Sequence, residues 1–173
     1  INNNPFRIAG ILANSSEKDI QKQKSKITRF TEVGKEVTSE YDFSFLNNIA
    51  RNNAVIDKAF SDIEQNQSRI NHALFWFVNS SPVDATAIQH LISGNKEKAL
   101  EIWEKLVTDK EVTAKNFSAF NNIGTLYFLE GSKSGLEKGI AAKLKLIESD
   151  HFTDFAHSVA DATFSPNTQK QTE

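Results

Sequence analysis

The sequence predicts an all-α protein. Only seven glycines and three prolines interrupt its 173 residues. Between these interruptions the apolar residues recur mostly three and four positions apart, which is the spacing of one face of a helix and not of a strand. A hydrophobic content of 39% at this length is enough to bury a core. We therefore expect helices along nearly the whole chain, in one domain or in two small ones packed together.

The first half of the sequence predicts three helical regions. The first begins at Ser16, whose hydroxyl can cap the following amides while acidic residues occupy the first turn, and it ends near Gly34. A second region covers 43–63, with a break expected among its asparagines. The third covers 68–78 and is stopped by Pro82, because the residue before a proline is disfavoured in helical conformation.

Beyond Pro82 the pattern changes to paired helices. Asp84 can cap the first of them, and Gly94 and Gly131 are placed to end helices of successive pairs. These helices are expected at 84–92, 96–107, 116–130, 135–148 and 152–164. In the helix at 135–148, the apolar face is formed by Leu136, Ile140, Leu144 and Ile147.

Two blocks of the first half carry a family resemblance. They read NPFRIAGI at 4–11, followed by SEKDIQK at 16–22, and AFSDIEQNQSR at 59–69. The first is similar to the opening of a DnaJ-type J-domain, which has the form Asn-Pro-Tyr, two residues, a Leu-Gly-Val turn, a Ser/Thr cap and an acidic residue before Ile-Lys-Lys. The second resembles the junction of the third and fourth helices of that family. The resemblance covers 4–77 and implies a small helical bundle.

This resemblance does not extend to the residues that give J-domains their activity. J-domains stimulate ATP hydrolysis by a DnaK-type chaperone through a His-Pro-Asp triplet just after the second helix. The gapless alignment places Glu32, Val33 and Gly34 at those positions, and the triplet occurs nowhere in the chain. The resemblance therefore implies the fold of a J-domain without its stimulation of ATPase activity.

A row of cations on the first long helix is the candidate partner-binding site. Lys18, Lys22, Lys26 and Arg29 are separated by four, four and three residues, which places them on one side of the helix. In J-domains such a face meets the acidic surface of the chaperone, so the resemblance implies that weak docking could survive. The alternative is a solvated, lysine-rich surface helix. Nucleic acid is not expected as a partner, because no aromatic side chains interleave with these charges.

The second half resembles tetratricopeptide repeats. The sequence GNKEKALEIWEKL at 94–106 is similar to the second helix of such a repeat, and NIGTLY at 122–127 resembles the core of its first helix. Gly124 and Ala99 are where helices of this family approach closely. The stretch 131–135 is longer than the usual turn of the repeat, and Thr86 stands with Ala87 where the family has Leu-Gly.

Two irregular repeats are fewer than the three or so that make a self-sufficient stack. The helix pairs are therefore expected to pack on the first half of the chain. The aromatic residues Phe75, Trp76 and Phe77 are the candidates for that junction. They are read either as core or as an exposed anchor for a partner.

Composition and motifs argue against catalysis. The absence of cysteine excludes disulfides, thiolate metal sites and cysteine nucleophiles, and it agrees with a reducing, cytoplasmic location. No phosphate-binding glycine motif or nucleophile elbow is present, so no cofactor is expected. The longest apolar run, 73–78, is too short to span a membrane. With a formal net charge of −2, the chain as a whole is not attracted electrostatically to nucleic acid or to anionic lipid.

One cluster of potential metal ligands lies near the C-terminal end of the sequence. Asp150, Asp154, His157 and Asp161 are spaced four, three and four residues apart and would share one face of a continuous last helix. The alternative is a polar outer face opposite the apolar residues of that helix. We predict no metal.

Taken together, the sequence predicts an all-α fold in three parts. A J-domain-like helical bundle at 1–80 packs on tetratricopeptide-like antiparallel helix pairs at 81–164, and 165–173 forms a disordered tail or linker. The expected function is a non-catalytic protein-interaction or scaffold module, the N-terminal part of a longer protein, with a protein partner of unspecified identity. The alternatives are a diverged co-chaperone that docks a DnaK-type chaperone without stimulating it, and a metal-dependent enzyme.

Overall fold

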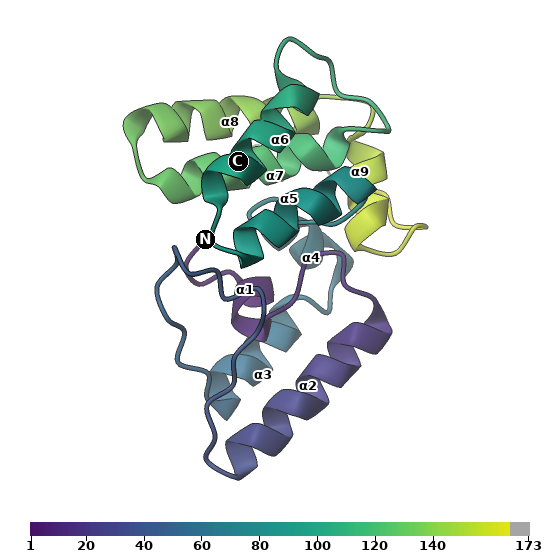
Figure 1. Cartoon of the computed structure of the whole chain (residues 1–173). Coiled ribbons are helices and arrows are strands. Elements are labelled where there is room, and N and C mark those ends of the chain that lie inside the picture. Colours follow the sequence, from purple (N-terminus) through teal and green to yellow (C-terminus); the bar gives the residue numbers. More distant parts are fainter. Residues whose placement is uncertain (167–173) are drawn as a thin grey trace.

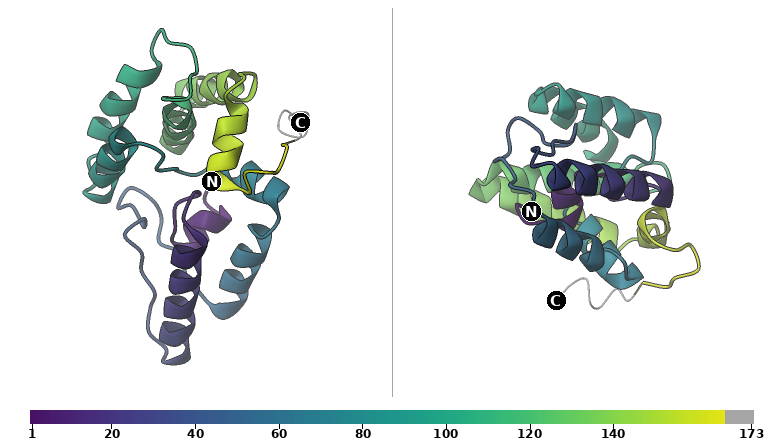
Figure 2. Two further views of the ribbon diagram at one scale, coloured as in Figure 1. Left: turned by 90° about the vertical axis from the view of Figure 1, so that its right-hand side faces the viewer. Right: turned by 90° about the horizontal axis from the view of Figure 1, so that it is seen from below.

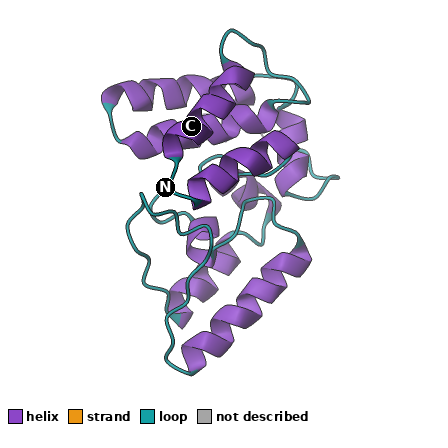
Figure 3. Cartoon of the chain, viewed as in Figure 1, coloured by secondary structure: helices purple, strands orange, loops and turns teal. Residues whose placement is uncertain are grey.

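The computed structural model describes residues 1–166, which form nine helices joined by loops and turns and contain no strand (Figure 3). The prediction of an all-α fold is confirmed. Within this range no helix is long and apolar enough to cross a membrane. Of the tail expected at 165–173, everything after residue 166 lies outside the described residues.

The first half of the chain contains four helices, with the long α2 and α3 side by side at one end of the molecule (Figures 1 and 2). The short first helix was not predicted. It is capped by the Asn4 side chain and ended by Gly10, whose φ of 69° is a left-handed conformation that glycine adopts without strain. Ser16 caps α2 as expected, accepting a hydrogen bond from the Asp19 amide. The four helices are α1 Pro5–Ala9, α2 Glu17–Glu32, α3 Asn53–Asp62 and α4 Asn66–Ala73.

The prediction of a helical region beginning at residue 43 is wrong for 43–52, which belong to the long loop between α2 and α3. Side chains fix this loop in place of helical hydrogen bonds. Phe43 is 2% exposed and its ring stacks on Trp76 at 6.0 Å between centroids. The buried guanidinium of Arg51 donates to the carbonyls of Ile8, at 2.7 Å, and Val37, at 2.9 Å, and pairs with Asp42. The apolar spacing therefore reflected loop anchors and not a helix face.

The helix expected at 68–78 is also shorter than predicted, because α4 ends at Ala73. The backbone that follows is held by tertiary hydrogen bonds from α7. Asn121 Nδ2 donates to the Trp76 carbonyl at 2.8 Å, and Asn122 exchanges two hydrogen bonds with the backbone of Val78. These amide side chains satisfy the polar groups that a longer helix would have paired.

Five helices make up the second half, α5 Pro82–Ile92, α6 Lys96–Val107, α7 Phe117–Glu130, α8 Lys133–Ile147 and α9 Phe152–Val159 (Figure 1). The first begins earlier than predicted, because Ser81 and not Asp84 is its N-cap. The stretch 131–135 is not a long turn, since Ser132 caps α8 and the helix has already begun at Lys133. The last helix ends at Val159, short of the predicted residue 164.

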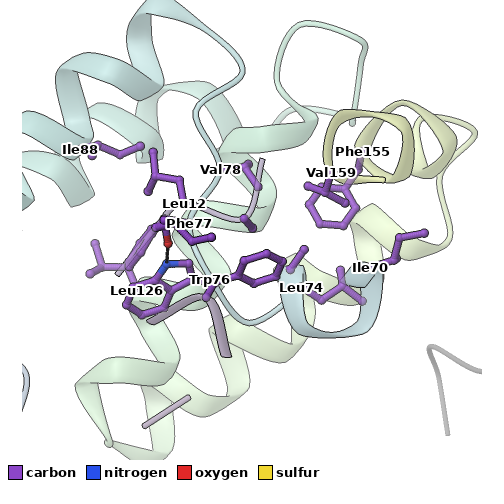
Figure 4. Packing of buried hydrophobic residues seen from close by; sticks show 14 of the residues in the cluster. Leu12, Ile70, Leu74, Trp76, Phe77, Val78, Ile88, Leu126, Phe155 and Val159 are labelled. Carbon is purple, nitrogen blue, oxygen red and sulfur yellow. Dashed lines mark hydrogen bonds between the residues drawn. The ribbon is translucent and has the colours of Figure 1, made fainter. Parts of the chain in front are cut away.

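One hydrophobic cluster contains residues of both halves. Trp76 and Phe77 are fully buried between them (Figure 4). Phe77 also stacks on Trp103 of α6 at 5.9 Å between ring centroids. The indole of Trp76 donates a hydrogen bond to the Ile11 carbonyl at 2.9 Å. Phe75 differs from its neighbours because it is 44% exposed. Of the aromatic run, two residues are core and one reaches the surface.

The predicted close approach of helices at Gly124 is confirmed. The neighbouring helix is α8, which also has glycines at the contact. A Cβ on Gly124 would lie 3.3 Å from the carbonyl oxygen of Gly139, and a Cβ on Gly139 would lie 2.7 Å from the ring of Phe128. Gly135 is buried on the same side of α8. Small residues therefore set the distance between α7 and α8, and they decide which face of α8 turns inward.

Candidate functional site

The predicted cationic row lies on α2, and its members differ in their surroundings. Lys18, Lys22 and Arg29 are exposed, while Lys26 is half-buried and its Nζ donates to the Thr38 carbonyl at 3.3 Å. Three of the four, Lys22, Lys26 and Arg29, line a groove of about 590 Å³ between α2 and the loop that follows it. Lys18 is not part of this groove.

This groove is mixed in charge and not purely cationic. Asp19 and Glu40 are among its lining residues, together with the hydroxyl of Tyr41. Burial, together with the neighbouring Glu40, raises the pKa of the Tyr41 hydroxyl to about 12, so the phenol stays neutral at physiological pH. An acidic partner would thus meet three cations interleaved with two carboxylates.

The residues aligned with the His-Pro-Asp triplet lie at the end of α2. The helix ends at Glu32, Val33 is 66% exposed, and Gly34 adopts a φ of 66°. The exposed turn that they form carries no imidazole.

A second surface, which was not predicted, is apolar. Among residues 1–166, the exposed large hydrophobic side chains include Phe75 at 44%, Leu136 at 52%, Ile140 at 45% and Leu144 at 39%. All four line one groove of about 660 Å³, which we call the α8 groove. Its walls are the exposed face of α8, the C-terminal part of α7, residues 74–75 and residues 1–2. Within it Phe75 stacks on Phe128 at 5.9 Å between ring centroids.

The sequence misassigned the inward face of α8. Leu136, Ile140 and Leu144 were expected to pack inward, but they are exposed, and of the predicted apolar face Ile147 alone is buried. The face turned toward α7 contains Gly135, Gly139, Lys143 and Leu146. Its two glycines, spaced four residues apart, were the available signal, because small residues at this spacing allow close helix contact.

The buried Lys143 belongs to the face of α8 that is turned toward α7, and it is also one of the residues that line the α8 groove. Its side chain passes Gly124, and Nζ donates to the Asn121 carbonyl, to Asn121 Oδ1 at 2.6 Å and to Thr125 Oγ1 at 2.9 Å. Burial lowers the pKa of the Lys143 ammonium well below its ordinary value. All of these contacts are made within the protein, so this lysine joins α8 to α7 and is not presented to a ligand.

Asp84 is a further charged side chain buried in the core. Its carboxylate is 0% exposed and accepts five hydrogen bonds, from Trp103 Nε1 at 3.0 Å, Asn122 Nδ2 at 3.1 Å, Ser118 Oγ at 2.7 Å, Ser81 Oγ at 2.9 Å and the Ser80 amide at 3.2 Å. These donors come from α6, α7 and the N-terminus of α5. The carboxylate therefore links three helices instead of facing a substrate.

The four potential metal ligands near the C-terminus are not brought together. His151 pairs with Asp154 at 2.7 Å, His157 Nε2 contacts the Phe164 carbonyl at 3.2 Å, and Asp161 lies beyond the end of α9, where it accepts from Thr163. No group of three or more His, Cys, Asp or Glu side chains suited to a metal ion occurs in the described part of the chain.

No protein-family model, curated protein or solved structure matches this chain. Function is therefore inferred from its own surfaces and contacts.

Proposed function

We propose that this chain is a non-catalytic protein-interaction module that binds a protein partner in the α8 groove. The observation that carries the proposal is the gathering of Phe75, Leu136, Ile140 and Leu144 in one groove, all of them exposed. Contiguous exposed apolar surface of this kind marks interaction sites in otherwise well-packed proteins.

The energetic reason is the burial of apolar area. Each of the four side chains is about half exposed, so covering each one is worth on the order of 1 kcal/mol. A groove between a helix and an aromatic ring also suits an amphipathic helix, which presents apolar residues every three or four positions. The expected contribution to the binding free energy is therefore spread over four side chains, at about 1 kcal/mol for each.

The buried charges support a module without chemistry of its own. Asp84 and Lys143 have every hydrogen bond satisfied by neighbouring protein groups. The resemblances of 4–77 to J-domains and of 94–127 to tetratricopeptide repeats, both protein-binding families, point in the same direction.

The test compares two surface variants in the same native lysate. The first variant carries Leu136→Ser, Ile140→Ser and Leu144→Ser, and the second replaces the four α2 cations, Lys18, Lys22, Lys26 and Arg29, with Glu. We expect the wild-type chain to enrich a defined protein that the first variant loses and the second retains, with both variants folded by circular dichroism. Equal capture by the wild type and the first variant would contradict the proposal.

The α2 groove supports a second candidate, docking to a DnaK-type chaperone without stimulation of its ATPase activity. The observation in its favour is that Lys22, Lys26 and Arg29 line one groove beside the turn at Glu32–Gly34. Binding of the purified chaperone should then be weakened by salt and lost in the Glu variant, with no rise in the rate of ATP hydrolysis. Salt-independent binding, or binding retained by the Glu variant, would reject this candidate.

A further inference from the structure

The exposed stripe of α8 is symmetric along the helix. Leu136 and Leu144 lie four residues on either side of Ile140, and all three are exposed. Residues four apart form a ridge on a helix surface, and two such ridges pack against each other when helices cross. A stripe that reads the same in both directions is suited to an antiparallel copy of itself, with Ile140 at the centre.

The charged residues at the two ends of α8 interact unfavourably with the dipole of their own helix. Lys133 is the first residue of α8, where the dipole is positive, and Glu148 is its C-cap, where the dipole is negative. The side chain of Lys133 is 91% exposed, and its ion pair with Glu137 is long, at 4.0 Å. On a monomer both placements are unfavourable.

An antiparallel pair reverses both effects. With the two-fold axis at Ile140, Lys133 of one copy lies opposite Ile147 of the other, one residue from Glu148. Lys133 of each copy then lies beside Glu148 and the negative end of α8 in the other copy. Because of the two-fold symmetry, this ion pair occurs twice. The end charges and the apolar stripe thus favour the same register.

We propose that the occupant of the α8 groove is a second copy of this chain, docked antiparallel through α8 about a two-fold axis at Ile140. The stripe of each copy covers the stripe and Phe75 of the other, and Lys133 pairs with Glu148 across the interface. This inference rests on the proposed function, because it names the partner of the same groove.

The test is a charge exchange followed by sedimentation equilibrium of the whole chain. Lys133→Glu alone and Glu148→Lys alone each place like charges together twice, and we expect the dissociation constant of the dimer to rise about tenfold. The double variant restores opposite charges and should return the constant to within about threefold of wild type. Ile140→Glu buries two carboxylates at the axis and should raise it by about 100-fold or more.

Lys115→Glu is the matched control, because Lys115 is exposed and lies outside the α8 groove. It should leave the dissociation constant unchanged. Circular dichroism of every variant separates loss of association from loss of fold.

Failure of this inference is distinguishable from failure of the proposed function. A chain that stays monomeric up to about 1 mM overturns the inference. If that monomer still captures a protein in a manner that depends on Ile140, the proposed function stands with a different partner. If it captures nothing, both are wrong. A dimer whose charge variants are not rescued by the double exchange also overturns the proposed register.

Discussion

Replacement of Asp84 by alanine is expected to destabilise the fold strongly. The carboxylate is fully buried and accepts five hydrogen bonds between 2.7 and 3.2 Å, from donors on α6, on α7 and in the two residues that precede α5. Each hydrogen bond to a charged acceptor contributes about 1.5–3 kcal/mol, but the donors share one acceptor and are not additive. Removing one partner of a buried charged network costs about 3–5 kcal/mol, and we expect the free energy of unfolding to fall by that amount.

Asp84→Asn should cost about half as much, roughly 1.5–3 kcal/mol. The asparagine side chain has the same shape as aspartate and keeps one acceptor oxygen. Its NH₂ group, however, would face groups that are themselves donors. The backbone N–H of Ser80 cannot act as an acceptor, so that hydrogen bond would be lost. The order of stability is therefore wild type, then Asp84→Asn, then Asp84→Ala.

The assay is urea denaturation followed by circular dichroism and by tryptophan fluorescence. Both tryptophans, Trp76 and Trp103, are 0% exposed, so fluorescence reports on the core that Asp84 joins. Asp57→Ala, at an exposed position of α3, is the control and should change stability by less than about 0.5 kcal/mol. A loss below about 1 kcal/mol for Asp84→Ala would refute the reasoning.

Three further predictions concern other parts of the core. Gly139→Ala should lower the free energy of unfolding by about 1–3 kcal/mol, because the new Cβ would lie 2.7 Å from the Phe128 ring. Burial lowers the pKa of Lys143, so between the folded and unfolded pKa values of this group the folded chain binds fewer protons than the unfolded chain. The free energy of unfolding should therefore rise with pH in that range. Lys143→Met should flatten this rise. Arg51→Lys should cost about 2–3 kcal/mol and speed hydrogen exchange in 33–52, because lysine cannot make the paired hydrogen bonds to Asp42.

Each of these has a result that would contradict it. An unchanged denaturation midpoint for Gly139→Ala would mean that α7 and α8 are not in close contact. The pH dependence is measured between about pH 7 and pH 9, below the range in which unfolded tyrosines begin to lose protons. Equal slopes for wild type and Lys143→Met would show that Lys143 is not desolvated. Unchanged exchange in Arg51→Lys would show that the loop is held by its apolar residues alone.

The sequence predicted helices well where local signals agree with packing. Ser16 caps α2 as its hydroxyl and the acidic first turn indicated, and Gly124 marks a close helix contact as expected. The cap depends on residues within one helical turn, which sequence spacing records directly, whereas the contact at Gly124 with α8 was expected only from the resemblance of 122–127 to a tetratricopeptide repeat.

The remaining errors arise where distant groups decide the local structure. Residues 43–52 have helical spacing, but Arg51 and Phe43 bind partners elsewhere in the chain. The apolar face of α8 was assigned inward because Leu136 and Ile140 are hydrophobic, whereas the glycines on the opposite face allow closer contact with α7. Burial of Asp84 and Lys143 could not be predicted, because their donors and acceptors come from other helices.

Site-specific photo-crosslinking tests most directly whether the α8 groove binds protein. A benzophenone side chain is placed at position 140, at the centre of the exposed stripe, or at position 115 as a control, and the native lysate is irradiated. Binding in the groove predicts a discrete crosslinked species from position 140, which for self-association has the mass of two chains, and no such species from position 115. Equal, diffuse labelling from both positions would contradict the assignment of the α8 groove as a binding surface.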